Sequence, residues 1–222
     1  MTINHQANDR SRTEEDLERI ARAMKLWSEG RDPKHTIVED YLRSRSLDLP
    51  PQLAGNVLRY HPRCPWRNEE TGTTERIPAL IAAFRSIDDD QVTGIHRIRL
   101  DQPQRWPKAE RRMLGVVHRA AVKLDPLSGT TLCIGEGVET SLAARQLGLT
   151  PTWALGSVGA ISFFPVIAGI KNLTILGETG SASKEATRLC ARRWRHVFRH
   201  VQVAMPEVGS DLNDALMMGN SR

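Results

Sequence analysis

The sequence TLCIGEGVETSLAARQL, which runs from Thr131 to Leu147, decides the fold. Its first four residues are apolar or β-branched, as in a short buried strand. Glycines then flank Glu136 on both sides and mark a turn. Residues 139–147 have the spacing and composition of a helix. A strand, a turn that carries a carboxylate and a helix therefore follow one another directly.

The same alternation continues to the end of the chain. We expect further strands at 153–155, 173–176 and 201–204, and helices at 183–198 and 211–218. Strands that alternate with helices, with no hairpin signal between them, predict a parallel sheet with helices on both faces. Residues 128–222 are therefore expected to form an α/β domain.

Residues 1–127 show a different order of predicted elements, with two helices followed by strands. A capped helix is expected after Thr13, a second short helix after Thr36, and strands at 57–61, 77–84 and 92–100, the last two joined by a turn at Asp88–Asp90. Residues 63–76 and 102–108 are polar or contain prolines, and we interpret them as loops. This part is expected to be a smaller α+β domain whose first 12 residues are flexible.

The composition is that of a globular protein. The 222 residues are 40% hydrophobic and 26% charged, with a formal net charge of +5. No apolar run approaches the roughly 18 residues of a membrane span, and the start of the chain lacks the apolar segment of a secretory signal. The three cysteines lie far apart without a CxxC pair, which argues against a disulfide scaffold and a zinc ribbon. These features predict a cytoplasmic protein with no membrane partner.

Basic residues gather in two blocks. Eight stand against two acidic residues between positions 97 and 123, and six stand against one between 184 and 199. Lys and Arg gain affinity for polyanions by displacing counterions from phosphates, so the blocks indicate nucleic-acid binding. The candidate side chains are Arg97, Lys108, Arg188, Arg192 and Arg195. Ordinary solvated helix faces would cluster in the same way, and this alternative stays open.

Acidic residues follow three of the four predicted strands. Glu136 follows the first and Glu178 the third, and Asp211 and Asp214 come soon after the fourth. Ligands of parallel sheets bind beyond the carboxyl ends of the strands, so we expect these side chains to converge. Converging carboxylates repel one another unless a cation lies between them, and oxygen ligands suit Mg²⁺. Asp211 alone would equally fit a helix cap.

Two motifs resemble those of Toprim domains, the nucleotidyl-transfer and phosphodiester-handling fold of bacterial primases and topoisomerases. Glu136-Gly-Val-Glu139-Thr resembles the first Toprim signature in the EGxET form of phage and plasmid primase-like proteins. Gly209-Ser-Asp211-Leu-Asn213-Asp214 resembles their G-x-D-x-N-D segment. The preceding part resembles the uncharacterised domain that often precedes Toprim in such proteins, at Ala23–Trp27, Tyr41–Arg43, Leu58–Pro62, Ile77–Ala79, Gly94–Arg97, Lys108 and Met113–Gly115.

The resemblance implies a Rossmann-like parallel sheet and a protein similar to the DNA primases of mobile elements, with a role in DNA replication. It implies Glu136 as the general acid/base, with Glu178, Asp211 and Asp214 holding Mg²⁺ or Mn²⁺. The implied partners are DNA or RNA and a replicative helicase on a separate chain.

One departure from the family pattern bears on catalysis. The second Toprim signature is Asp-x-Asp, where this chain has Glu178-Thr179-Gly180, so one carboxylate has a longer arm and the other is missing. Losing a ligand weakens Mg²⁺ binding. Two functions therefore stay open: a Mg²⁺-dependent nucleotidyltransferase, or a degenerate Toprim module that binds nucleic acid or acts as an accessory subunit. A small-molecule phosphotransferase or nucleotide-binding protein is a third possibility.

Overall fold

The computed structural model describes residues 12–219. In chain order its helices and strands are α1 (Glu14–Glu29), α2 (Ile37–Ser44), β1 (Leu58–Arg67), β2 (Thr74–Ser86), β3 (Val92–Arg99), the 3-10 helix η1 (Pro103–Lys108), β4 (Arg111–Gly115), β5 (Ala120–Lys123), β6 (Thr131–Gly135), α3 (Val138–Gln146), β7 (Thr152–Ala154), α4 (Val158–Phe163), β8 (Asn172–Leu176), α5 (Ser181–His196), β9 (His200–Ala204) and α6 (Leu212–Gly219). We refer to residues 12–127 as the N-terminal half and to residues 128–219 as the C-terminal half.

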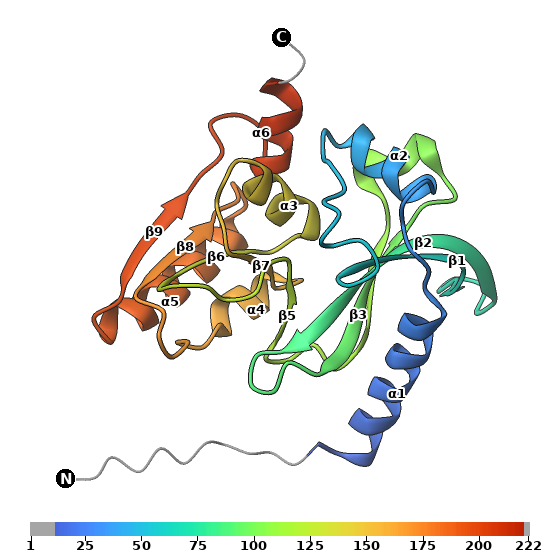
Figure 1. Cartoon of the computed structure of the whole chain (residues 1–222), viewed down its shortest axis with the longest axis horizontal. Coiled ribbons are helices and arrows are strands. Elements are labelled where there is room, and N and C mark those ends of the chain that lie inside the picture. Colours follow the sequence, from blue (N-terminus) through green and yellow to red (C-terminus); the bar gives the residue numbers. More distant parts are fainter. Residues whose placement is uncertain (1–11, 220–222) are drawn as a thin grey trace.

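The C-terminal half has the predicted α/β architecture. Strands β7, β6, β8 and β9 are parallel neighbours in this order. Successive residues of β6 point to opposite faces, as the pleat of a strand requires. Leu132 and Ile134 pack with Cys190 and Trp194 of α5, whereas Cys133 packs with Ala144 of α3. Helices therefore cover both faces, with α3 against α6 and α4 against α5 (Figure 1).

The two predicted helices of the N-terminal half are confirmed, each with its cap. The Oγ1 of Thr13 accepts a hydrogen bond from the Asp16 N–H, and the Asp16 carboxylate accepts one from the Thr13 N–H. Thr36 caps α2 by accepting a bond from the N–H of Val38. Capped in this way, α2 buries Tyr41 and Leu42 in the main core.

The prediction of a loop over residues 63–76 is wrong. Strand β1 extends to Arg67 and pairs with β2 from Thr74 onward, so that only a short turn separates them. Polar side chains and prolines are tolerated because this two-stranded ribbon is solvated along one face and contains an irregularity between His61 and Cys64.

The N-terminal half also contains elements that the sequence did not predict. Residues 103–108, interpreted as a loop, form the 3-10 helix η1, whose first residue is a proline, the position where its missing N–H costs least. The short strands β4 and β5 add to the sheet: β4 pairs with β3, and β5 pairs antiparallel with β2 and with β7.

Strand β5 joins the two halves into one sheet. Among residues 12–219 the sheet has nine strands, in the order β4-β3-β2-β5-β7-β6-β8-β9, with β1 paired to β2. The two halves therefore share continuous backbone hydrogen bonding rather than only side-chain contacts.

No helix of residues 12–219 combines the length and apolar character that crossing a membrane requires. The expected flexibility of residues 1–12 concerns a segment that, apart from Arg12, lies outside the described residues.

Candidate functional site

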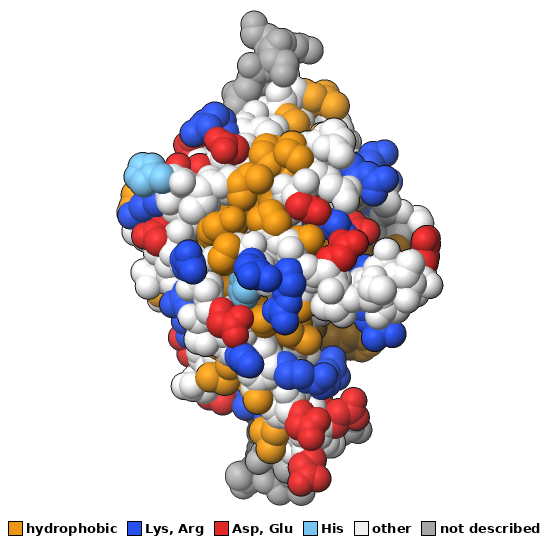
Figure 2. Space-filling view, turned by 90° about the vertical axis from the view of Figure 1, so that its right-hand side faces the viewer, with side chains coloured by type: hydrophobic (Ala, Val, Ile, Leu, Met, Phe, Trp, Pro, Cys, Tyr) orange, Lys and Arg blue, Asp and Glu red, His pale blue; other side chains and the backbone are white. Residues whose placement is uncertain are grey.

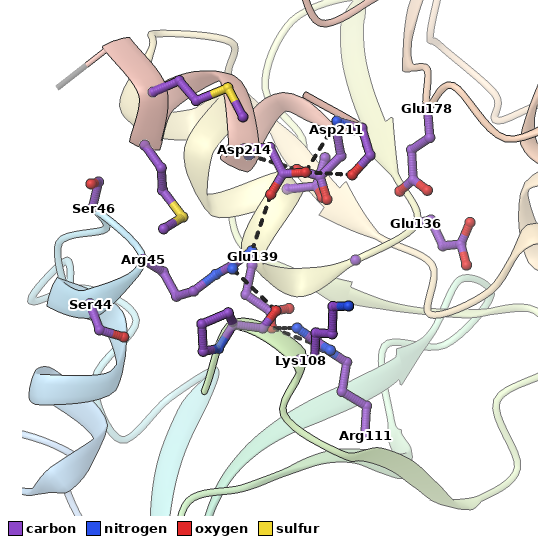
Figure 3. Close-up of a pocket in the computed structure, with 16 residues that line it drawn as sticks. Ser44, Arg45, Ser46, Lys108, Arg111, Glu136, Glu139, Glu178, Asp211 and Asp214 are labelled. Atoms are coloured by element: carbon purple, nitrogen blue, oxygen red, sulfur yellow. Dashed lines mark hydrogen bonds and ion pairs between the residues drawn. The ribbon is translucent and has the colours of Figure 1, made fainter. Parts of the chain in front are cut away.

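A cleft of about 930 Å³ lies where the carboxyl ends of β6 and β8 meet the N-terminal half. One wall carries acidic side chains from the C-terminal half, and the other carries basic side chains from α2, η1 and β4 (Figure 3). The acidic wall holds Glu136, Glu178, Asp211 and Asp214, and the basic wall holds Arg45, Lys108 and Arg111.

Glu136 occupies the turn between β6 and α3. Glycine on its amino-terminal side is required by close packing, because a Cβ at Gly135 would lie 2.7 Å from the Ser141 Oγ. Half-burial raises the pKa of the Glu136 carboxyl, and a hydrogen bond from the Val158 N–H opposes this change. A half-buried carboxylate with a raised pKa is suited to exchanging a proton with a ligand oxygen.

Glu178 follows β8 and faces Glu136 across the rim (Figure 3). Burial, together with the negative charges of Glu136, Asp211 and Asp214, raises the pKa of Glu178 to about 7. The carboxylates of Glu136, Asp211 and Asp214 therefore lie close enough to Glu178 to repel its negative charge. A cation between them would relieve this repulsion.

Asp211 and Asp214 lie at the start of α6. The Asp211 Oδ1 accepts a hydrogen bond from the Asp214 N–H at 2.9 Å, so Asp211 caps the helix while also lining the cleft. Asp214 accepts hydrogen bonds from the backbone and hydroxyl of Ser210 and lies 3.8 Å from the guanidinium of Arg45. The Ser210 bonds, followed by the charge of Arg45, lower the pKa of Asp214 despite partial burial.

Arg45 is the buried cation of the basic wall. Only 6% of the residue is exposed, and its Nε has no hydrogen-bond partner within the described structure. Its Nη1 donates to the Pro107 carbonyl at a long 3.4 Å. Lys108, which was predicted to contact nucleic acid, lines the same cleft and has no ion-pair partner among residues 12–219. Lys108 is therefore available to an anion in the cleft, whereas Arg45 already lies 3.8 Å from Asp214.

Glu139 lies one helical turn after Glu136 but has a different environment. It is buried, and its Oε1 accepts hydrogen bonds from the Arg111 Nη2 at 2.6 Å and the Tyr41 hydroxyl at 2.5 Å. Burial alone would raise the pKa of Glu139, but the charge of Arg111, followed by the Tyr41 hydrogen bond, lowers it to about 2. Glu139 is thus an ionised residue that joins the two halves.

The other basic candidates lie outside the lining of the cleft. Arg97 donates to the Pro65 carbonyl and lies over the Trp66 ring. On α5, Arg188 pairs with Glu185, Arg195 donates to the Val201 carbonyl, and Arg192 is exposed. A role of these four arginines in nucleic-acid binding stays a prediction.

The outer face of the N-terminal half shows how basic and acidic groups mix. Lys and Arg side chains gather across its middle, with Asp and Glu among them (Figure 2). Five of the eight basic residues between positions 97 and 123 have acidic partners within the described residues, namely Arg99, Arg111, Arg112, Arg119 and Lys123. Much of the first basic block is therefore a paired surface.

The acidic wall fits a divalent cation only in company with other ligands. Within residues 12–219, no three His, Cys, Asp or Glu side chains are grouped so that they could hold a metal ion by themselves. Mg²⁺ is commonly held by one or two carboxylates together with water and substrate phosphates. The oxygen donors of Glu178 and Asp211 fit this mode of binding, whereas Asp214 is already partly neutralised by Arg45.

Sequence reasoning missed Arg45 and the pairing of Arg111 with Glu139. Arg45 follows α2 and stands in no long basic block, since Glu39, Asp40 and Asp48 lie close to Arg43 and Arg45 in the sequence. Arg111 was counted in a block, but only the tertiary structure brings it to Glu139. The nearest signal was the Tyr41–Arg43 segment, which ends two residues before Arg45.

Two protein-family models match the chain. A domain of unknown function (DUF7146) covers residues 17–124, and a Toprim domain covers residues 131–221. A search of curated proteins found no match.

Solved structures of primase domains share the fold. The DnaG primase catalytic domain bound to single-stranded DNA aligns with a TM-score of 0.64 at 12% identity, covering 93% of this chain and 76% of that one. The Escherichia coli primase catalytic core gives a TM-score of 0.61 at 12% identity, with 91% and 75% covered. The primase fragment of the bacteriophage T7 primase-helicase gives 0.50 at 17% identity, and the alignment spans 66% of this chain and only 60% of that fragment.

Proposed function

We propose, from the premise that this chain carries a Toprim domain preceded by a domain of unknown function, that it is a primase-like protein that binds nucleic acid in its cleft. One observation carries the proposal. Five carboxylates from three segments of the C-terminal half and three cations from the N-terminal half line the same space of about 930 Å³, and one of these carboxylates, Glu139, is paired with Arg111. A cleft with both kinds of charge suits a phosphate ester together with a divalent cation.

The basic wall would bind the phosphate groups. Lys108 has no ion-pair partner among the described residues, and Arg45 has only the 3.8 Å ion pair with Asp214, while its burial strengthens its interaction with an anion. The DnaG primase catalytic domain that shares this fold was solved bound to single-stranded DNA, and DNA or RNA is the ligand class that we assign to this cleft.

The side chains of the acidic wall would take part in the transfer reaction. Glu136 would exchange a proton with the attacking or leaving oxygen of the phosphodiester. Glu178 and Asp211 would hold Mg²⁺ or Mn²⁺, which supplies positive charge against the charge that develops on the transferred phosphoryl group. The reaction class is nucleotidyl or phosphoryl transfer, in a replication setting in which a helicase on another chain is the proposed partner.

A degenerate Toprim module is the second candidate, and Gly180 favours it. This residue replaces a carboxylate of the Toprim signature, and a Cβ built on it has no neighbour within 4 Å. Packing therefore does not require glycine here, so the missing carboxylate is not imposed by the fold. A protein of this kind would bind nucleic acid as an accessory subunit without performing transfer.

A Mn²⁺ titration in the presence of single-stranded DNA and labelled nucleotides separates the two candidates. Bound Mn²⁺ is measured by electron paramagnetic resonance, and product by incorporated label. The variants are Glu136→Gln and Glu178→Gln, with Glu185→Gln as the matched control because Glu185 is an exposed acid on α5.

The outcomes point in different directions. Saturable Mn²⁺ binding that requires Glu178, with incorporation that requires Glu136, supports the enzyme. DNA binding without a Glu136-dependent response supports the accessory module. Failure to bind DNA under any of these conditions contradicts both.

A further inference from the structure

Glu139 contributes to the junction of the two halves rather than to the acidic wall. Only 4% of the Glu139 surface is exposed, although Glu139 lies only three positions after Glu136. Its Oε1 lies 2.9 Å from the Arg111 Nε and 2.6 Å from the Arg111 Nη2. The Tyr41 hydroxyl donates to the same oxygen. One carboxylate oxygen from α3 therefore receives bonds from β4 and α2 together.

Removing one partner of this contact is costly because the contact is buried. A buried carboxylate is stabilised only when opposite charge and hydrogen-bond donors surround it, and removing one member leaves the other charge uncompensated. Arg111 keeps 34% of its side chain exposed, at the cleft, while Glu139 keeps 5%. The paired guanidinium is thus held at the rim of the cleft by an anion behind it.

Further bonds extend the same junction along α2 and α3. The Gln146 side chain accepts a bond from the Asp48 N–H and donates to the Ser46 carbonyl. The buried Asn213 donates to the Arg45 carbonyl at 2.8 Å. Each of these bonds joins the segment from α2 to Asp48, which includes Arg45, to α3 or α6, the helices that begin next to Glu136 and Asp211.

We propose that Glu139 is a positioning residue that fixes the basic wall of the cleft at its distance from the acidic wall. Through Tyr41 it holds α2 and therefore Arg45, and through Arg111 it holds β4, which begins three residues after Lys108. The expected effect of Glu139 on nucleic-acid affinity rests on the proposed function. Its expected effect on the position of α2 does not.

Pulsed electron paramagnetic resonance between two spin labels measures that position without any ligand. The labels are placed at Arg43→Cys on α2 and Leu147→Cys after α3, since both residues are exposed. The native cysteines are all buried, so labelling is selective. Glu139→Gln removes the charge. Glu185→Gln is the matched control, because it breaks an exposed ion pair of the same 2.6 Å length on α5.

The expected result is a shifted or broadened distance distribution for Glu139→Gln and an unchanged one for Glu185→Gln. The equilibrium constant for unfolding should rise roughly 30-fold or more for Glu139→Gln and only a few-fold for the control. Affinity for single-stranded DNA should fall about tenfold in Glu139→Gln, because a small misplacement of binding groups is costly.

Two further variants separate positioning from stability. Tyr41→Phe removes one hydroxyl and leaves the charge pair, so it should fold and give a smaller shift in the same direction. The double variant Glu139→Gln/Arg111→Gln leaves no unpaired charge, so it should recover stability without recovering the distance. An unchanged distance in every folded variant overturns the proposal. A changed distance in a protein whose wild type binds no DNA supports the positioning role and contradicts only the proposed function.

Discussion

Gly180 is the residue at which the candidate site departs most from the Toprim pattern. Its backbone is extended, with φ −63° and ψ 143°, and it caps α5 without a side chain. This conformation is open to any L-residue, and space is available for a side chain.

Gly180→Asp should strengthen binding of Mn²⁺ roughly tenfold, since each added carboxylate increases the attraction for a divalent ion. It should also stabilise the fold by a few tenths of a kcal/mol, about the gain of Asp over Gly at a helix cap. Calorimetric titration with Mn²⁺ checks the first effect. Ala182→Asp is the control, because it adds the same charge to the same exposed helix start. Equal affinities for the two variants would contradict a cation site at this rim.

His96 is a buried titratable group of β3. It is 5% exposed, its Nδ1 has no hydrogen-bond partner in the described structure, and burial lowers its pKa to about 4 against the opposing charge of Glu139. The folded protein therefore keeps His96 neutral at pH values where the unfolded chain is protonated.

The free energy of unfolding should fall as the pH falls from about 6.5 to about 4, because the unfolded state alone takes up the proton in this window. His96 should lower the free energy of unfolding by about 3 kcal/mol in total. None of this decrease should be present above about pH 6.5, and all of it should be present below about pH 4. Urea unfolding of wild type and His96→Gln at several pH values measures it. The variant should lose this slope, and His196→Gln, at an exposed position on α5, should keep it. Parallel pH profiles for wild type and His96→Gln would refute the assignment.

At the scale of elements, the loop after β7 packs directly against β2. Gly156 has φ +86°, and a Cβ there would lie 2.6 Å from the Phe84 Cζ. Gly148 has nearly the same backbone conformation, with φ +88°, but a Cβ on it would meet nothing within 4 Å.

Gly156→Ala should therefore destabilise the protein by about 1–3 kcal/mol more than Gly148→Ala. Both variants place alanine in the left-handed region, but only Gly156→Ala also forces a methyl group against the Phe84 ring. Denaturant unfolding of the two variants gives the difference. Equal midpoints would show that the β7 loop does not pack on Phe84 as described.

The elements that could be predicted are those specified by their own residues. The strands and helices of 131–219 follow from short apolar runs, turns and periodic helices, and the carboxylates could be placed because each follows a strand. The start of β1 and most of β2 were predicted as strands, but the end of β1 and the start of β2 were not, because Pro62 and Pro65 weaken the local signal and only pairing with β2 makes this part a strand. Arg45 and the role of Glu139 depend on contacts between the halves, about which local sequence says nothing.

At the scale of the whole molecule, the nine-stranded sheet of residues 12–219 makes the two halves one folding unit. β5 pairs with β2 on one side and with β7 on the other, so neither half can lose its structure without exposing the edge of the other.

Thermal unfolding should accordingly be a single transition, with the calorimetric enthalpy equal to the van't Hoff enthalpy. Scanning calorimetry tests this. Two resolved transitions, or hydrogen exchange that protects one half after the other has opened, would mean that β5 does not couple them.

The most direct test of the cleft as a nucleic-acid site is the affinity for single-stranded DNA in Mg²⁺ across a range of salt concentrations, for wild type, Lys108→Met and Lys25→Met. Lys25 is an exposed lysine on α1 and serves as the control. The affinity of the wild type should fall steeply as salt rises, and Lys108→Met should weaken binding and reduce the slope of log affinity against log salt by about 1, with Lys25→Met like wild type. No binding at low salt, an affinity indifferent to salt, or a Lys108→Met protein that binds like wild type would contradict the account.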